Sequence, residues 1–377
     1  MIKLKKSILN DYVYWVLAPH LITEDPDLNY YYDFDQSISE YTKVFDELKL
    51  TWQWQPIRLD NYKEIIYKIA SSQNGKLPFV INLCDGDELN GVPGLSIIHE
   101  LERYQILYTG ADALFYEITT SKIPMKKAFD FHGVPTPIWE VISNKRKTSA
   151  AIFNKLGSSI ILKPAVSGGS MGISIKNVVQ SNEELERRVH EMRKGYHGWN
   201  LSAQGIIAEQ YISGREFTTF VCGSYLNKEN LKFYAPVERI FHESLTSTEK
   251  FLSFDRLWET YYEEPPMPDE GFFFQYAPVN SELKEALCQI SLDAYVAVGG
   301  TGYGRLDIRM DESTGKLYVL EVNAQCGISE DENFTSIGAI LKFSDESFTD
   351  LIKDIIVDTL IHKQIKRPSQ KVNVAAL

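Results

Sequence analysis

Two acidic residues and an amide are spaced along this chain in a way that suits magnesium-dependent chemistry. From Gly302 to Ile328, apolar residues alternate with polar ones, and turn residues interrupt the alternation at 311–315. Period-two alternation around such a turn predicts a β-hairpin, which brings Asp307 near Glu321 and Asn323. Oxygen ligands of this kind suit Mg²⁺ when substrate phosphates complete its shell. Taken alone, a hairpin with a solvated polar face is the simpler interpretation.

A glycine-rich turn lies far upstream of that hairpin. Lys163 precedes the run Ser167-Gly-Gly-Ser-Met-Gly172. Glycines let backbone N–H groups approach an anion closely, and a nearby lysine adds positive charge. The run is not a Walker A loop, because no Gly-Lys-Ser/Thr follows it. We interpret it as a flap over phosphates, and a plain hairpin turn is an equally weighted alternative.

Two glutamates flank a short turn between two predicted strands. Glu209 ends the first strand, and Glu216 follows the Ser213-Gly214 turn. One carboxylate beside a strand edge can accept from an adenine amino group, and the other can accept from ribose hydroxyls. Taken singly, each glutamate is more often a solvated turn residue.

The first third of the chain alternates apolar strand and helix patterns, which favours a βαβ domain with a parallel sheet. The predicted strands are 12–18, 51–58 and 77–83, and the predicted helices are 33–49 and 61–70. The acidic turn at 84–88 then falls at the carboxyl end of a strand, where open α/β sheets bind ligands.

The rest of the chain mixes strands with helices. The predicted helices are 121–131, 181–192, 281–298 and 347–361, with Ser181 and Glu184 forming a capping box. Besides the hairpin, the predicted strands are 160–163, 173–178, 206–210, 216–221 and 233–238. The segment 242–280 is irregular and rich in proline, which indicates a functional lid or disorder.

Bulk composition narrows the class of protein. The chain has 377 residues, a formal net charge of −12 and 44% hydrophobic residues, as expected for a globular protein of two or three domains. The acidic balance argues against a nucleic-acid partner. Four scattered cysteines argue against disulfides or a zinc site. The same scattered cysteines favour a reduced, cytoplasmic setting. No stretch is long and apolar enough to cross a membrane, so we expect no membrane partner; a homodimer is left open.

Taken in order, these features resemble the ATP-grasp superfamily, and most closely its D-alanine–D-alanine ligase branch. The resemblance covers Thr109 to Gly327. Its pieces are Thr120-Ser-Lys122, Leu162-Lys-Pro-Ala165 with the glycine-rich loop, Ala208 to Thr218, and Gly304-Arg-Leu-Asp307 through Leu320-Glu-Val-Asn323 and Gly327. Each piece is weak alone, but four in the family's order and spacing are specific.

The resemblance implies an α/β (α+β) fold of three domains in the ATP-grasp arrangement. Residues 1–118 would form an N-terminal parallel-sheet substrate domain. Residues 119–205 would form the central ATP-grasp subdomain with the glycine-rich loop, and 206–377 the C-terminal ATP-grasp subdomain with the Mg²⁺ site.

The resemblance also implies a role for each matching residue. Lys122 and Lys163 would contact the ATP phosphates, and the loop of Ser167, Gly168, Gly169, Ser170 and Met171 would close over them. Glu209 would hold the adenine amino group beside the backbone of Tyr211 and Ile212, and Glu216 the ribose. Asp307, Glu321 and Asn323 would hold two Mg²⁺ ions, with Mn²⁺ as an alternative metal. Arg305, the Gly327 N–H and Ser170 would form the catalytic group.

The implied reaction is carboxylate–amine ligation. ATP would phosphorylate a carboxylate, and an amine would attack the acyl phosphate, releasing ADP and phosphate. The expected substrates are small carboxylates and amines, above all amino acids; a carrier-protein or thiol acceptor stays open. One alternative is a true D-alanine–D-alanine ligase of cell-wall synthesis. Another, of a different class, is an inactive nucleotide-binding regulator.

The chain departs from the family at its amino end. The family's Gly-Gly-x-Ser-x-Glu start has no match here, so the glutamate that grips the first amine has no clear counterpart. Glu24, Asp33 and Asp35 are candidates for that role, and solvated loop acids are the commoner interpretation of each.

Further departures follow Asn323 and fall in the irregular segment. Cys326 replaces the proline of the family's Thr-x-Pro-Gly; a packed thiol is a simpler interpretation than a nucleophile. The acidic run 330–333 predicts a cationic or amine-bearing acceptor, with Ser336 as the alternative binding residue. Lys250, Arg256 and Arg239 are the basic candidates for a residue over the site.

Overall fold

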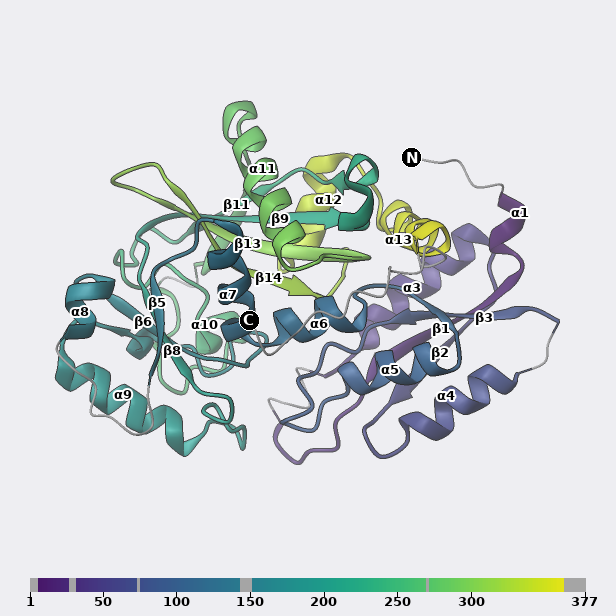
Figure 1. Cartoon of the computed structure of the whole chain (residues 1–377), viewed down its shortest axis with the longest axis horizontal. Helices are drawn as coiled ribbons and strands as arrows, with labels where there is room; N and C mark the ends of the chain where they lie inside the picture. Colours follow the sequence, from purple (N-terminus) through teal and green to yellow (C-terminus); the bar gives the residue numbers. More distant parts are fainter. Residues whose placement is uncertain (1–5, 27–31, 73–74, 143–150, 269–270, 363–377) are drawn as a thin grey trace.

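The structure is a computed structural model that describes residues 6–26, 32–72, 75–142, 151–268 and 271–362. Three β-sheets organise these residues, and they occupy separate regions of the molecule (Figure 1). The first is parallel and lies at the amino end, and the other two are antiparallel. No helix within the described ranges is long and apolar enough to cross a membrane.

The first sheet has four strands in the order β2-β1-β3-β4. These are β1 (Tyr12–Pro19), β2 (Trp52–Ile57), β3 (Leu77–Asn82) and β4 (Leu107–Tyr108), connected through α3 (Asp35–Leu48), α4 (Tyr62–Ser71) and α5 (Leu95–Arg103), and preceded by α1 (Lys6–Leu9). Residues of β1 alternate between two cores: Leu17 packs in the core with α4 and α5, whereas Tyr14 and Val16 pack in the core with α3. The sheet is therefore covered by helices on both faces, as parallel sheets are.

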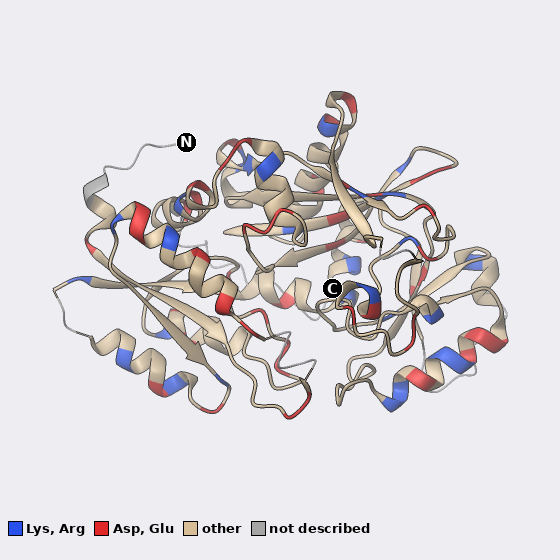
Figure 2. Cartoon of the chain, turned by 180° about the vertical axis from the view of Figure 1, so that it is seen from behind, with Lys and Arg blue, Asp and Glu red and all other residues tan. Residues whose placement is uncertain are grey.

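Two helices lead from this sheet to the second one. They are α6 (Ala113–Thr120) and α7 (Lys122–His132). The second sheet has the order β5-β8-β6-β7, with β5 (Trp139–Ile142), β6 (Ile160–Pro164), β7 (Val178–Val179) and β8 (Ile206–Gln210). Helices α8 (Ala151–Leu156) and α9 (Asn182–Lys194) cover it and share its core. Helix α9 carries acidic residues in its first turn and basic ones in its last, on the outer face of the molecule (Figure 2), which complements the helix dipole.

The third sheet has the order β12-β11-β9-β13-β14, and β10 pairs with β9. Its strands are β9 (Gly214–Cys222), β10 (Lys232–Phe233), β11 (Val237–Phe241), β12 (Phe274–Pro278), β13 (Tyr303–Asp311) and β14 (Leu317–Ala324). Its other elements are η2 (Tyr225–Asn230), α10 (Phe254–Leu257), α11 (Ser281–Ala297), α12 (Ser336–Ser344) and α13 (Phe348–His362). Helix α11 packs on one face, with Leu287 and Ala294 in the core that also holds Leu306 and Val319.

The hydrophobic cores show which sheets form one body. One core joins α4 and α5 to β13, β14 and α11, and a second joins α3 and β1 to β9, α12 and α13. Both cores thus run through the first and third sheets. The core of the second sheet contains only residues between Ile142 and Ala208.

Most sequence-predicted elements are present, but two strand predictions are wrong. The stretch 173–178 contains η1 (Ile175–Asn177), a 3₁₀ turn, because the buried Asn177 side chain bonds the carbonyls of Leu162 and Gly172 and bends the chain. The stretch 233–238 is split between β10 and β11, because Pro236 has no N–H for a ladder.

The three-domain boundaries remain predictions, and strand pairing bears on one of them. Strand β8, which follows the predicted boundary at residue 205, pairs with β5 and β6 of the second sheet. The irregular segment 242–280 contains α10 and β12, and its residues 269–270 lie outside the described residues.

Candidate functional site

A cavity of about 550 Å³ is lined by residues of the second and third sheets and by loop and helix residues that flank the first sheet. It contains all but one of the residues proposed from the sequence to bind ATP or metal or to act in catalysis: Lys122, Lys163, Ser167, Gly168, Gly169, Ser170, Glu209, Tyr211, Ile212, Glu216, Arg305, Asp307, Glu321, Asn323 and Gly327. The exception is Met171, which is buried in a small apolar cluster with Trp199 and Phe254.

The hairpin of β13 and β14 presents one polar face to this cavity. Asp307 lies opposite Glu321, and Arg305 lies opposite Asn323. Cross-strand partners share a face of the sheet, so all four side chains project together. The amide of Asn323 donates to Asp307 at 3.1 Å and to Glu321 at 3.4 Å. The predicted convergence of two carboxylates and an amide is therefore present.

Neighbouring groups hold this acidic pair in place. Thr218 Oγ1 on β9 donates to Asp307 Oδ1 at 3.0 Å, and Arg305 donates to Asp307 Oδ2 at 3.1 Å. Lys122 Nζ lies 3.3 Å from Glu321 Oε2. Burial alone would raise the pKa of Glu321, but Lys122, Lys163 and Arg305 hold that pKa well below its usual range. Glu321 is thus ionised, as a metal ligand must be.

The donor set fits a hard divalent cation that also binds phosphate. Within the residues that the structure describes, no three His, Cys, Asp or Glu side chains form a metal cluster. Asp307 and Glu321 with the Asn323 amide instead form a partial shell of oxygen donors. Mg²⁺ is commonly held in this way, by one or two carboxylates together with substrate phosphates and water.

A buried group of two lysines and one glutamate lies beside the hairpin. Glu209 on β8 is 1% exposed, and its carboxylate oxygens lie 3.2 Å from Lys126 Nζ and 2.9 Å from Lys163 Nζ. Lys126 also donates to Thr136 Oγ1 at 2.7 Å. Burial lowers the pKa of Lys126 to about 8, although Glu209 opposes this shift. The two lysines lower the pKa of Glu209 despite its burial, so the carboxylate is charged.

Glu216 has a similar arrangement at the other glutamate position. Its carboxylate contacts Arg239 on β11 and Arg309 on β13, the latter at 2.9 Å. Arg309 also donates to the Ile212 carbonyl at 2.8 Å and lies over the Tyr211 ring, 5.2 Å from its centroid. Arg309 therefore connects Glu216 to the backbone that we expect beside adenine.

The glycine-rich loop follows β6 and contains left-handed backbone, with one non-glycine residue, Ser170, in that conformation. Gly169, Ser170 and Gly172 have φ of 54°, 62° and 76°, a region that favours glycine. Trp258 Nε1 donates to the Gly169 carbonyl at 2.9 Å, and the Phe254 N–H donates to the Ile173 carbonyl at 2.8 Å. The segment 242–280 thus covers the loop, as expected for a lid.

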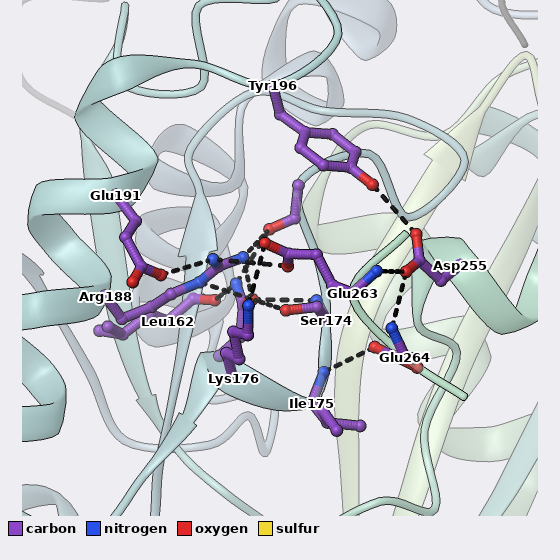
Figure 3. Close-up of polar contacts among 12 residues, drawn as sticks. Leu162, Ser174, Ile175, Lys176, Arg188, Glu191, Tyr196, Asp255, Glu263 and Glu264 are labelled. Atoms are coloured by element: carbon purple, nitrogen blue, oxygen red, sulfur yellow. Dashed lines mark hydrogen bonds and ion pairs between the residues drawn. The ribbon is translucent and has the colours of Figure 1, made fainter. Parts of the chain in front are cut away.

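A polar network attaches this lid to the second sheet (Figure 3). Asp255 accepts from Tyr196 at 3.0 Å and from the Glu264 N–H at 2.9 Å. Glu264 in turn accepts from the Ile175 N–H at 2.8 Å, next to the glycine-rich loop. The lid and the loop therefore form one unit with the central sheet. Of the three basic candidates, Arg239 lines the cavity, whereas Lys250 and Arg256 do not, and Arg256 pairs with Glu249.

The tail of the hairpin differs from one sequence expectation. Glu330 pairs with Lys43 at 2.9 Å, Glu332 pairs with Lys342 at 2.7 Å, and Asp331 accepts from the Asn333 and Phe334 N–H groups. None of these acids lines the cavity. The expectation that they select a cationic acceptor is therefore unsupported, because each already has a partner.

Two other residues of this tail do line the cavity. Ser336 begins α12 there. Cys326 is 8% exposed, and burial raises the pKa of its thiol to about 12. A thiol with so high a pKa remains protonated, which agrees with a packing role and not with a nucleophile.

Sequence reasoning missed three polar residues of the site. Lys126 lies four residues after Lys122 on the same face of α7, and Arg309 is two residues after Asp307 on one face of β13. The spacing could have shown that Lys126 shares a helix face with Lys122 and that Arg309 shares a strand face with Asp307. Asp85, which follows β3 and lines the cavity, lies in the acidic turn that sequence reasoning placed at a ligand-binding edge without naming a residue.

Comparisons with known proteins agree with this site. The family model for the D-ala D-ala ligase C-terminus matches residues 129–357. The D-alanine–D-alanine ligase of Polynucleobacter asymbioticus is 26% identical over 264 residues, which cover 70% of this chain and 69% of that protein. The ligase of Pseudoalteromonas translucida is 27% identical over 260 residues, covering 69% and 74%.

Solved structures show the same fold. A D-alanine–D-alanine ligase from Bacillus anthracis complexed with ATP has a TM-score of 0.64 at 18% identity, with 93% of this chain and 97% of that chain covered. The D-Ala:D-Ser ligase VanG from Enterococcus faecalis has a TM-score of 0.64 at 16% identity, with 93% and 99% covered. Since the family model spans more than half of the sequence, the chain belongs to the D-alanine–D-alanine ligase branch of the ATP-grasp superfamily and is an ATP-dependent carboxylate–amine ligase.

Proposed function

We propose that this enzyme activates the carboxylate of an amino acid, or of a similar small acid, with ATP and joins it to an amine or a second amino acid. The observation that carries the proposal is the shared face of Arg305, Asp307, Glu321 and Asn323, which lies in one cavity with Lys122, Lys163 and the glycine-rich loop. Carboxylates and cationic groups thus line one space, a combination that suits Mg²⁺ and a triphosphate.

The nucleotide would lie between the second and third sheets. Lys122 and Lys163 would meet its phosphates, and backbone N–H groups from Ser167 to Ser170 would cover them. Asp307, Glu321 and Asn323 would hold Mg²⁺, which neutralises charge on the transferring phosphoryl group. Two ions are proposed. The backbone of Tyr211 and Ile212, with Glu209 and Glu216, would take the adenosine.

The carboxylate would be activated beside Arg305. A free carboxylate is a poor acyl donor, because its leaving group would be oxide; phosphorylation creates a good leaving group. The amine then attacks, and the tetrahedral oxyanion accepts hydrogen bonds from Arg305 and the Gly327 N–H. The loop and the lid, joined through Trp258 and Gly169, exclude water that would hydrolyse the acyl phosphate.

A second candidate is D-alanine–D-alanine ligation itself. The names of the relatives favour it, and Ser336 begins α12 at the cavity wall, where helical N–H groups suit a second carboxylate. The absent glutamate motif at the amino end counts against it. An inactive nucleotide-binding regulator is disfavoured, because the set of Asp307, Glu321 and Asn323 is intact.

The test is phosphate release from Mg-ATP with single amino acids and amino-acid pairs of both chiralities, with products identified by mass spectrometry. The proposal expects phosphate and an amide-linked product in equal amounts for at least one pair. Turnover with D-alanine alone identifies the second candidate. Binding of Mg-ATP with no turnover on the whole panel contradicts both and favours the regulator.

A further inference from the structure

Four of the carboxylates that line the cavity are paired with a larger number of cationic side chains. Four carboxylates contact six cationic side chains: Glu209 contacts Lys126 and Lys163, Glu216 contacts Arg239 and Arg309, Asp307 contacts Arg305, and Glu321 contacts Lys122. All of these cations except Lys126 line the cavity, so five positive groups face four carboxylates in this part of it, as suits phosphates.

Asp85 and Asp87 are two further acids that line this cavity. Asp85 is the more exposed of the two. Among the residues that the structure describes, no lysine, arginine or histidine forms an ion pair with Asp85. Burial within the cavity, and then the charge of Asp87, raise the pKa of Asp85 to about 6. A cation supplied by a ligand would therefore stabilise the ionised form of Asp85.

The turn that contains Asp85 lies beside the tail that follows β14. Asn82, the last residue of β3, offers its carbonyl to the Gln325 side chain, directly after β14. This contact brings the turn after β3 against the tail that contains Cys326 and Gly327. The charge of Asp85 acts on the Cys326 thiol, and so does the charge of Arg305. Asp85 and Arg305 both line this cavity.

The other acids of this turn have structural partners. Asp87 accepts from the Asn90 N–H at 3.0 Å and from its side-chain amide at 2.9 Å. Glu88 accepts from the N–H groups of Gly94 and Ser96 at the start of α5. These bonds shape the turn, so only Asp85 among the three is left for a ligand.

We propose that Asp85 binds the ammonium group of the amino acid whose carboxylate is phosphorylated. The inference rests on the proposed function and assigns the donor: an α-amino acid in its protonated form. The attacking amine must lose its proton, so a carboxylate that holds an ammonium suits the donor and not the acceptor. Holding the donor amine protonated also prevents it from acting as a nucleophile.

The sequence also suggested three other acids that could bind an amine. Glu24, Asp33 and Asp35, which the sequence suggested for an amine, are exposed, and none of them lines the cavity. Asp33 accepts from the N–H of Asp35 at the start of α3. Asp33 is nevertheless the competitor to test, because its neighbours Tyr32 and Phe34 do line the cavity.

The test uses hydroxylamine as the acceptor, so that only the donor site is probed. The full-length enzyme, Mg-ATP and hydroxylamine are incubated with an amino acid or with its des-amino carboxylate, and the hydroxamate is measured. The wild type is expected to prefer the amino acid, and Asp85→Asn to lower kcat/KM for it by about 10- to 100-fold, as loss of a charged hydrogen bond does. The variant should use the des-amino carboxylate as well as the wild type does.

Matched variants complete the design. Asp87→Asn removes the same charge from the same turn and is expected to keep the preference for the amino acid. The proposal is overturned if Asp85→Asn retains the preference, or if Asp33→Asn loses it in place of Asp85→Asn. If the wild type forms no hydroxamate from any carboxylate, the proposed function itself fails. Melting temperatures with and without Mg-ATP confirm that each variant folds and binds nucleotide.

Discussion

Lys126 and Glu209 form an ion pair that is closed to solvent: the lysine is 0% exposed and the glutamate 1%. The pair joins α7 to β8, and Glu209 also holds Lys163 at the cavity wall. Removing one partner of a buried pair leaves the other charge uncompensated. Lys126 is therefore a positioning residue, which sets where Glu209 and Lys163 lie.

Lys126→Met is expected to raise KM for ATP by about 10-fold, on the order of one lost charged hydrogen bond, with a smaller effect on kcat. The same loss should occur in the wild type as pH rises through about 8, the lowered pKa of Lys126, because the cation is present only below it. Steady-state kinetics from pH 7 to 9 check both. The exposed Lys127→Met is the control, and an equal pH dependence in Lys126→Met would contradict the assignment.

Glu321→Gln tests the metal shell. Loss of one of two carboxylates removes several kcal/mol of charge stabilisation, so turnover should fall by at least about 1,000-fold. Glu312→Gln changes an exposed acid of the same hairpin, which bonds Ser213, and should keep normal activity. Phosphate release at saturating Mg-ATP is the measurement, and near-normal turnover of Glu321→Gln would refute the assignment.

Trp258→Phe tests the lid. The indole bond to the Gly169 carbonyl is lost, which costs about 1 kcal/mol and should lower kcat by about 5-fold. A looser loop admits water, so phosphate released per amide formed should exceed one. Trp139→Phe, which removes an exposed indole bond to Asp130, serves as the control. Unchanged coupling in Trp258→Phe would show that the bond does not hold the loop closed.

The raised pKa of Asp85 predicts that the stability of the folded protein depends on pH. Its folded pKa is about 6 against an ordinary 3.8, so the folded protein binds this proton more tightly than the unfolded chain. Ionised Asp85, beside Asp87 and the un-ionised Tyr116 and Cys84, thus destabilises the ligand-free enzyme above pH 6. Asp85→Asn should raise the melting temperature at pH 7.5, and the gain should shrink as pH falls from 6 toward 4. A gain that is constant with pH would contradict this.

The polar face of the hairpin was predictable because period-two alternation directly fixes which side chains share a face. Arg305, Asp307, Glu321 and Asn323 therefore lie as expected. The same reasoning failed for 173–178, where apolar residues suggested a strand but the buried Asn177 amide bonds backbone carbonyls instead. The local sequence pattern does not show that a buried polar side chain will bond backbone carbonyls in place of a neighbouring strand.

Partners distant in sequence explain the other differences. The acids from Glu330 to Glu332 looked available for a ligand, but Lys43 lies 287 residues away in the chain and pairs with Glu330. Conversely, the sequence placed the acidic turn 84–88 at a ligand-binding edge but gave Asp85 no role, and only the contact of Asn82 with Gln325 shows that this turn lies beside the tail of the hairpin. Which charged residues form pairs depends on the tertiary structure, and the spacing of residues along the sequence does not show it.

The second sheet, which lies in the central part of the chain, has a hydrophobic core of its own, and this affects how the protein unfolds. Two of the three large cores each cross the first and third sheets, while that of the central sheet is confined to it. Contiguous units with their own cores open independently. The central unit should therefore melt in its own transition, below that of the remainder, and nucleotide should merge the two by bridging them. Calorimetry with and without a non-hydrolysable ATP analogue would resolve one transition or two.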